Sequence, residues 1–230
     1  MSPAPSSRGA VVEKSADFTK RWRRVAAAGA LYYTAENISD AQLSALFAPP
    51  AALKISSLGR GGGHFTQAEL GPLRLKIYRR GGLFGKLFPL CGLDEAATTR
   101  ELAAELALSG AGLATQETLA MCIQRDAPRL RAIQRYFPDE VTHAELAARK
   151  TLTEAQRHGA DELLQKIVAA GYLHRDSNGG NLLWNESGYG WRIIDLASAR
   201  PLGSMNPTRA LAMMRARLAK PPRAYRNAWR

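Results

Sequence analysis

Apolar and polar residues follow several different periods along the chain, and each period predicts a different element. Between residues 73 and 78, apolar side chains alternate with longer polar ones, which is the two-residue period of a strand. Glycines dominate residues 59–63 just before it, so this part predicts a strand, a glycine turn and a second strand. Earlier, a capping box at residues 39–42 precedes a short apolar run that ends at two prolines, which predicts a short helix.

The remainder of the chain contains three further helical stretches and three short apolar ones. The predicted helices are 95–108, 143–149 and 153–170, with glycines closing the first and the third. The predicted strands are 119–124, 130–136 and 191–196. This order of strands, a helix, strands and helices predicts an α+β fold.

The predicted elements divide the chain into four parts. Residues 1–17 mix Pro, Ser, Ala and charged residues without a period, so we expect a disordered arm. Residues 18–53 are predicted to form an N-terminal helical brace, 54–136 a small sheet lobe, and 137–230 a compact lobe with a basic tail. A chain of 230 residues with 46% hydrophobic composition can bury one core or two small lobes that share an interface.

The charge of the chain is strongly basic, with 32 basic and 20 acidic side chains and a net charge of +12. Such a surface attracts phosphates, nucleic acid or anionic lipid head groups, and charge alone does not distinguish them. Seven basic residues and no acidic one lie between residues 201 and 230. No apolar run reaches the roughly 18 residues of a membrane span, and the two cysteines are too few for a disulfide framework, so we expect a cytoplasmic protein.

The loop from His174 to Asn181 carries the most specific chemical pattern. Its D-x-x-x-x-N spacing, preceded by His-Arg, is the spacing with which kinases place a base and a metal-binding amide. Asp195 lies 14 residues beyond Asn181, and a turn in between returns its carboxylate beside the loop. We therefore predict Asp176 as the catalytic base and Asn181 and Asp195 as ligands of Mg²⁺, with His174 as a structural brace. The alternative is that the loop residues are ordinary turn formers.

Phosphate contacts are predicted in the preceding lobe. Gly59 and Gly61 belong to a loop whose backbone amides can approach the phosphates of ATP, although a plain hairpin turn has the same composition. Lys76 follows on the next strand, within reach of the same phosphates, unless it simply faces solvent. Its partner is Glu101 or Glu105, which lie one helical turn apart, and we favour Glu101.

Residues 73–87 resemble the segment that follows the glycine loop in bacterial lipopolysaccharide core kinases, particularly Kdo kinases. The run Tyr-Arg-Arg-Gly-Gly at residues 78–82 is the most specific part of this likeness. Further matches fall in register at residues 59–61, 99–101, 174–181 and 194–196, so that the likeness covers about residues 55–200.

The resemblance implies the two-lobed fold of protein kinases, with a small antiparallel sheet lobe followed by a mainly helical lobe. It also implies ATP-dependent phosphorylation of a sugar hydroxyl, on Kdo or a heptose, in the inner core oligosaccharide attached to lipid A. By the same resemblance, Asp176 is the base, and Asn181 and Asp195 hold the metal. Lys76 contacts the phosphates beside Glu101.

The implied location is the cytoplasmic face of the inner membrane, and we expect the basic residues to attach the protein to that anionic surface. Trp22 and Trp229 stand beside arginines and are interpreted as interfacial anchors. No dedicated nucleic-acid partner is expected.

Two other functions compete with this interpretation. The first is a minimal atypical kinase that phosphorylates a protein or a small molecule with the same base and metal ligands. The second is a catalytically silent kinase-like module that binds polyanions through its basic surface. Retention of Asp176, Asn181 and Asp195 together argues against the second. The acceptor sugar, its hydroxyl and the oligomeric state stay open.

Overall fold

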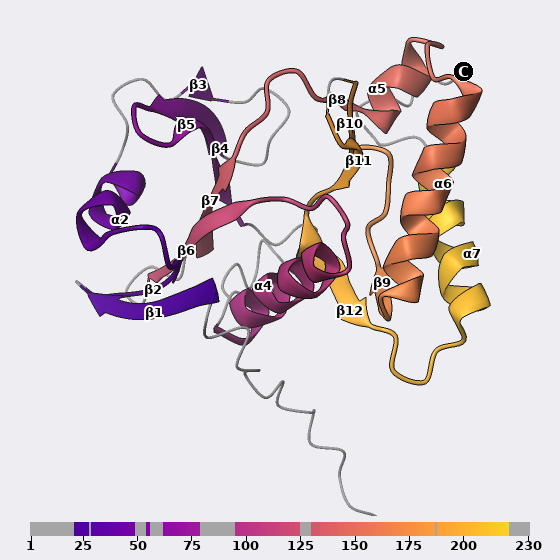
Figure 1. Ribbon diagram of the computed structural model, residues 1–230. Helices are drawn as coiled ribbons and strands as arrows, with labels where there is room; N and C mark the ends of the chain where they lie inside the picture. The colour runs from indigo at the N-terminus through magenta and orange to yellow at the C-terminus, as the bar shows by residue number, and fades with distance from the viewer. Residues whose placement is uncertain are drawn as a thin grey trace, which may run out of the picture.

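The computed structural model describes residues 21–27, 29–48, 54–55, 62–78, 95–124, 130–186 and 188–220. These residues form two lobes, one built on a large antiparallel sheet and one built mainly on helices (Figure 1). The α+β fold expected from the sequence, with a small antiparallel sheet lobe followed by a mainly helical lobe, is confirmed.

The sheet of the first lobe has seven strands, and every neighbouring pair is antiparallel. In spatial order they are β1 (Trp22–Ala27), β2 (Ala30–Ala35), β6 (Thr118–Gln124), β7 (Leu130–Arg135), β5 (Gly71–Ile77), β4 (Gly62–Gln67) and β3 (Lys54–Ile55). Two helices accompany the sheet, α2 (Asp40–Phe47) and α4 (Glu95–Gly110). Leu102 of α4 packs with Trp22 and Met121, whereas Leu46 of α2 packs with Leu73 in a separate cluster.

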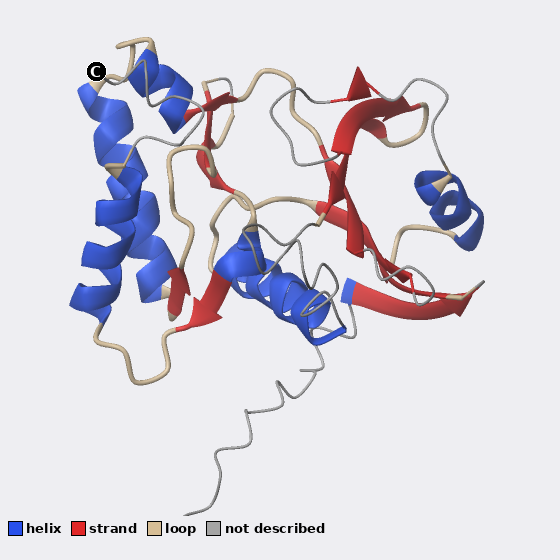
Figure 2. Cartoon of the chain, turned by 180° about the vertical axis from the view of Figure 1, so that it is seen from behind, coloured by secondary structure: helices blue, strands red, loops and turns tan. Residues whose placement is uncertain are grey.

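The second lobe contains longer helices and two small sheets. Its helices are α5 (His143–Ala148), α6 (Glu154–Ala169), the 3-10 helix η1 (Leu196–Ser198) and α7 (Pro207–Leu218). Its strands are β8 (Val141–Thr142), β9 (Tyr172–His174), β10 (Leu182–Asn185), β11 (Gly190–Ile193) and β12 (Ala199–Pro201). Figure 2 shows α6 and α7 side by side at one end of the molecule, with the large sheet at the other.

Helix α4 lies between the two lobes and contacts both (Figure 1). One side of the helix packs against β6 of the large sheet, and another packs against η1 and β12 of the second lobe. The chain passes from the first lobe to the second at residues 136–140, between β7 and β8. These connections place the ends of β10 and β11 close to β5 and α4, which is where the predicted site residues lie.

Most predicted elements are present, because their caps and periods are local. Helix α6 starts after Thr153, whose side chain accepts a hydrogen bond from the Gln156 amide in a capping box. Strands β6 and β7 correspond to the stretches predicted at 119–124 and 130–136.

The helical brace predicted for residues 18–53 is wrong for its first half. Trp22–Ala27 and Ala30–Ala35 pair as the hairpin β1–β2, and among the described residues of this part only Asp40–Phe47 is an α-helix. Gly29 makes the turn at a φ of 72°, a left-handed conformation that glycine adopts at little cost. The hairpin extends the large sheet because Leu31 and Tyr33 bury their side chains against α4 and its neighbours.

Trp22 is only 3% exposed and packs in the core, so its interpretation as a membrane anchor is wrong. Trp229, the arm at 1–17 and the glycines at 59 and 61 lie outside the described residues. Among the helices that the structure does describe, none is both long and apolar enough to span a membrane.

Helix α7 was not predicted from the sequence, which indicated only a basic tail in this part of the chain. Asn206 caps its first turn, and Pro207 occupies the first helical position, where a missing amide proton costs nothing. Ala210 and Met214 are fully buried against the second lobe. Met214 also holds the candidate catalytic loop, since its sulfur accepts from the His174 amide at 3.4 Å and its carbonyl accepts from the Ser177 hydroxyl at 3.2 Å.

Truncation of Met214 to alanine should therefore destabilise the protein by about 2–5 kcal/mol, the cost of removing a large side chain from a packed core. The measurement is urea unfolding followed by circular dichroism. Arg209→Ala, on the exposed side of the same helix, is the matched control and should change the unfolding free energy by less than about 0.5 kcal/mol. Equal effects of the two changes would contradict the packing of α7 described here.

Candidate active site

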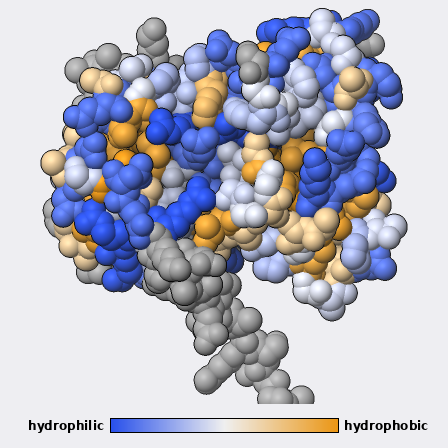
Figure 3. Space-filling model, in the orientation of Figure 1, coloured by the Kyte–Doolittle hydropathy of each residue, from blue (hydrophilic) through white to orange (hydrophobic). Residues whose placement is uncertain are grey.

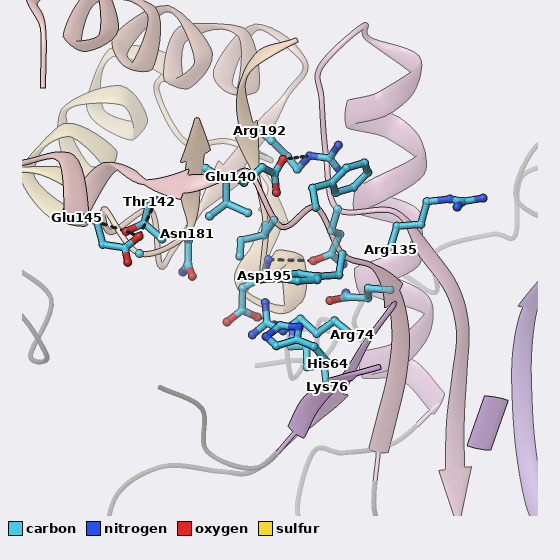
Figure 4. Close-up of a pocket in the computed structure, with 17 residues that line it drawn as sticks. His64, Arg74, Lys76, Arg135, Glu140, Thr142, Glu145, Asn181, Arg192 and Asp195 are labelled. Carbon is cyan, nitrogen blue, oxygen red and sulfur yellow. Dashed lines mark hydrogen bonds and ion pairs between the residues drawn. The ribbon is translucent and has the colours of Figure 1, made fainter. Parts of the chain in front are cut away.

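A cavity of about 440 Å³ lies between the lobes, and it is lined by three of the predicted site residues, Lys76, Asn181 and Asp195 (Figure 4). From the sheet lobe it is lined by His64, Arg74, Lys76, Gln116, Gln134 and Arg135. From the connection and the second lobe it is lined by Tyr136, Phe137, Glu140, Thr142, Glu145, Gly180, Asn181, Leu183, Arg192, Ile194 and Asp195. Strongly hydrophilic residues also lie along the junction of the lobes on the face shown in Figure 3.

Lys76 of β5 joins two carboxylates. Its Nζ lies 2.8 Å from Oδ1 of Asp195 and 3.4 Å from Oε1 of Glu101, whose side chain is 1% exposed. The hydroxyl of Tyr78 donates a second hydrogen bond to Glu101 Oε1 at 2.7 Å. Burial alone would lower the pKa of Lys76, but the carboxylates of Glu101 and Asp195 outweigh burial and raise it, so the ammonium stays charged. Of the two glutamates considered from the sequence, Glu101 makes this contact.

Asp195 follows β11 in a strained backbone conformation. Its φ of 59° is left-handed, which costs a non-glycine residue roughly 1–3 kcal/mol. The imidazole of His174, fully buried, lies 3.1 Å from the Asp195 carbonyl and 3.2 Å from the Ile194 carbonyl. The predicted bracing contact of His174 is therefore present. Burial would raise the pKa of Asp195, yet the Lys76 ammonium lowers it overall, so the residue is ionised.

The loop after β9 holds Asp176 and Asn181 by short-range hydrogen bonds. The Asn181 amide donates to the Asp176 carbonyl at 2.7 Å and lies 3.3 Å from its Oδ2. Asn178 donates to Asp176 Oδ1 at 2.7 Å and accepts from the Gly180 amide at 2.8 Å. The backbone amide of Asp176 donates to the Ser198 hydroxyl at 3.1 Å. These contacts keep the Asp176 carboxylate beside Asn181 and leave the Asn181 amide oxygen free to bind a cation.

The oxygen donors at the cavity fit a magnesium ion that is also bound by phosphates. Asn181 precedes β10 and Asp195 follows β11, so both line the cavity at the open end of the β10–β11 hairpin. Mg²⁺ usually takes one or two protein carboxylates together with phosphate oxygens and water. Within the described residues, no group of three or more His, Cys, Asp or Glu side chains forms a metal site of its own.

Gln116 is a site residue that the sequence did not reveal. It is 3% exposed, and its amide nitrogen donates to Glu101 Oε1 at 2.9 Å and to Glu105 Oε2 at 3.4 Å. Its amide oxygen accepts from the Asp195 backbone amide at 2.9 Å. One side chain therefore connects α4 to the strained Asp195. A lone glutamine before an apolar strand has no distinctive spacing, so only its burial identifies it.

Glu105 completes this buried network. Its side chain is 0% exposed, and it accepts from the Thr118 backbone amide at 3.0 Å and from Arg21 at 3.4 Å. Burial raises the pKa of Glu105 to about 7 in spite of these contacts.

At the other end of the cavity, Arg192 joins the second lobe to the crossing at 136–140. Its Nε lies 2.9 Å from Glu140, and its guanidinium stacks 3.9 Å from the Phe137 ring centroid. Close by, the rings of His64 and Tyr136 stack at 3.9 Å. The cavity thus has a charged end at Lys76 and an aromatic end at the lobe connection.

The family model and the similar proteins found by comparison agree on one family of kinases. A model of the lipopolysaccharide kinase (Kdo/WaaP) family matches residues 50–210. A 3-deoxy-D-manno-octulosonic acid kinase of Xanthomonas oryzae pv. oryzae (strain PXO99A) is 29% identical over 178 residues, covering 72% of this chain and 70% of its own. A kinase of the same name from Xylella fastidiosa (strain M23) is 26% identical over 174 residues, again covering 72% and 70%.

Among solved structures, one described as WaaP in complex with acyl carrier protein is similar to this chain. It has a TM-score of 0.49 and 17% sequence identity, covering 81% of this chain and 79% of that chain.

Gln116→Leu should weaken ATP binding in the presence of magnesium by about tenfold, because it removes the acceptor of the Asp195 amide and one of the hydrogen bonds to Glu101. Binding measured without magnesium should change less. The measurement is titration of a fluorescent ATP analogue with and without the metal. Thr34→Val, at a fully buried polar residue of β2 away from the cavity, is the control and should leave both affinities unchanged. Equal losses in the two variants would contradict the role of Gln116.

Replacement of Glu105 by Gln should change how stability depends on pH. With a folded pKa of about 7 against an ordinary 4.5, the wild-type carboxyl binds its proton more tightly when folded. Its contribution is full below pH 4.5 and is lost as the pH rises through 7, an effect of at most about 3 kcal/mol.

Urea unfolding at several pH values tests this. Relative to Glu105→Gln, the wild type should lose stability between pH 5 and pH 8, and the comparison cancels other titrating groups that both proteins share. A difference independent of pH would show that Glu105 does not titrate in this range.

Proposed function

This chain belongs to the lipopolysaccharide kinase (Kdo/WaaP) family, and we propose that it transfers the γ-phosphate of ATP to a hydroxyl of a Kdo sugar in the lipopolysaccharide inner core. A phosphotransferase that acts on a sugar hydroxyl of the core is the activity of the family. The finer assignment to Kdo rather than a heptose is supported by the relatives, which are named 3-deoxy-D-manno-octulosonic acid kinases.

The observation that carries the proposal is the contact of Lys76 with Glu101 and Asp195 at the edge of the cavity. A charged lysine oriented by a buried glutamate is the arrangement with which kinases hold ATP phosphates. We assign the phosphates to this charged end. The adenine base is assigned to the aromatic end beside Tyr136 and Phe137. As predicted from the sequence, the backbone amides of Gly59 and Gly61 are assigned to the phosphates.

In the proposed reaction, Asp176 accepts the proton of the acceptor hydroxyl. The hydroxyl oxygen forms a bond to the γ-phosphorus while the bond from that phosphorus to the bridging oxygen of ADP breaks. Asn178 and Asn181 orient the Asp176 carboxylate through the contacts at 2.7 Å and 3.3 Å. ADP and the phosphorylated sugar are the products.

Asn181 and Asp195 would hold Mg²⁺. When bound, the ion neutralises charge on the β- and γ-phosphates. Asp195 is kept ionised by Lys76, and its direction is set by the hydrogen bonds of its backbone to Gln116 and His174. The protein therefore supplies an aligned oxygen donor before any nucleotide arrives.

The acceptor is attached to a lipid, and the basic surface supports a peripheral position on the cytoplasmic face of the inner membrane. Arg209 in α7 and Lys220 just after it are exposed and make no ion pair with any described residue, whereas Arg215 is bound to Asp161 at 2.5 Å. Exposed cations near a membrane are attracted to anionic lipid by about 1 kcal/mol each.

Two functional alternatives remain as outcomes of the test. A kinase with a different hydroxyl substrate would bind ATP and magnesium and phosphorylate another member of an acceptor panel. A silent module would bind polyanions without any turnover of ATP.

The test measures transfer of labelled γ-phosphate from ATP and magnesium to lipid A carrying Kdo. Asp176→Asn should lower kcat by about 10²–10⁴, the usual contribution of a general base, while ATP binding persists. Asp161→Asn, in α6 and away from the cavity, removes the ion pair with Arg215 and should behave as the wild type. Transfer that survives undiminished in Asp176→Asn would remove its role as base. Binding of ATP without transfer to this acceptor would redirect the assignment to another hydroxyl.

A further inference from the structure

Three arginines from three separate elements gather beside the candidate base, and the reaction proposed above uses none of them. Arg175 directly follows β9, Arg200 lies in β12, and Arg100 lies in α4, one residue before Glu101.

The ladder between β9 and β12 places the first two on one face. Arg200 pairs with Leu173, and the backbone amide of Arg175 donates to the Ser198 carbonyl at 3.3 Å. In such an antiparallel pair, Arg175 and Arg200 are diagonal neighbours, which places their Cβ atoms roughly 7–8 Å apart. This spacing is short for two side chains that carry the same charge.

The third arginine comes from the helix that packs on this ladder. Helix α4 contacts both η1 and β12, so its Arg100 approaches from the side of the first lobe. The pKa of Arg200 is lowered, first by burial and then by the charges of Arg100 and Arg175, so both of these guanidinium groups repel that of Arg200.

The charge of this cluster is not neutralised within the part of the chain that the structure describes. Arg200 donates to the carbonyls of Ala197 at 2.8 Å and Ala199 at 2.6 Å, which are neutral groups. None of the three arginines forms an ion pair with a described carboxylate. Glu101 attracts Arg200 but is already bound by Lys76, Tyr78 and Gln116. Repulsion between like charges that no carboxylate neutralises lowers the stability of the fold, and an anion bound to the arginines would remove this cost.

The cluster is also fixed relative to the base. Ser198 accepts the hydrogen bond of the Asp176 amide, and its carbonyl accepts that of Arg175. A ligand whose anionic group binds the arginines would therefore present neighbouring hydroxyls to the Asp176 carboxylate.

We propose that Arg100, Arg175 and Arg200 form a binding site for an anionic group of the acceptor, a carboxylate or a phosphate, and so orient its hydroxyl towards Asp176. Guanidinium groups bind both anions in a two-pronged geometry, which fixes orientation as well as affinity. This inference rests on the proposed function for the identity of the acceptor, and a Kdo sugar is itself an acid whose carboxylate would suit the site.

The experiment compares Arg100→Met, Arg200→Met and the double variant of the full chain with the wild type. Each single change should raise KM for Kdo-bearing lipid A by about tenfold, the range expected for one charge-assisted hydrogen bond. The KD for ATP should stay within about twofold. Arg149→Met, at an exposed arginine after α5, is the matched control for loss of one surface charge. Melting temperatures identify any variant that fails to fold.

Chemical changes of the acceptor identify the source of the anion. If the Kdo carboxylate is the ligand, its methyl ester should bind the wild type about tenfold more weakly and bind Arg200→Met no worse than the unmodified acceptor does. If a lipid A phosphate is the ligand, dephosphorylated lipid A should instead bind the wild type about tenfold more weakly and bind Arg200→Met no worse than the unmodified acceptor does. Unchanged KM in the double variant, or equal losses for every acceptor in every variant, would overturn the site.

Direct binding of Kdo-bearing lipid A in detergent micelles, measured without ATP, separates this inference from the proposed function. Binding by the wild type that weakens in the double variant but not in Arg149→Met supports the arginine site, even if no phosphate is transferred. Failure of transfer with that binding intact counts against the proposed reaction. Binding equal in all proteins counts against the arginine site.

Discussion

The contact of one partly buried ammonium group with two carboxylates is the constraint on which this structure depends. Lys76 belongs to β5, Glu101 to α4 and Asp195 to the segment after β11, so their contact joins the two lobes. Figure 4 shows Lys76 and Asp195 at the cavity. Glu101 is 1% exposed, and an ionised group is stable at such a depth only when charges and hydrogen bonds surround it. Lys76, Tyr78 and Gln116 supply them. Removing any one of these partners would take away one of the three contacts that stabilise the buried Glu101 carboxylate.

Much of the surrounding fold maintains this contact. Helix α4 buries Leu102 against the large sheet and turns Glu101 and Glu105 towards the lobe boundary, so one helix serves both the core and the site. On the other side, Asp195 adopts a left-handed backbone that Gln116 and His174 hold by hydrogen bonds. Strain and a raised carboxyl pKa are costs that a stable core would avoid. Their presence together at one place is characteristic of a functional site.

Positive charge occurs in two groups near the loop that carries Asp176 and Asn181. Lys76 and Arg74 line the cavity, where we propose that the phosphates of ATP bind. Arg100, Arg175 and Arg200 do not line it, and we propose that they hold the acceptor. A phosphoryl transfer enzyme must bring two negatively charged reactants together, and separate groups of cations for each reduce the repulsion between them.

The sequence by itself determined the features that depend on neighbouring residues. The spacing of Asp176 and Asn181 predicts their meeting because short-range hydrogen bonds of Asn178 and Asn181 shape that loop. Helix α6 was predictable from its own cap and period.

Only the tertiary structure decided the hairpin β1–β2, the burial of α7, the role of Gln116 and the grouping of the arginines. Each of these depends on burial or charge between distant segments, as Lys76 and Asp195 do across 119 positions. The periodicity of apolar residues and the capping of helices depend on residues a few positions apart, so both can be predicted from the sequence. Desolvation and charge pairing depend on which segments come together in space, and no short stretch of the sequence contains that information.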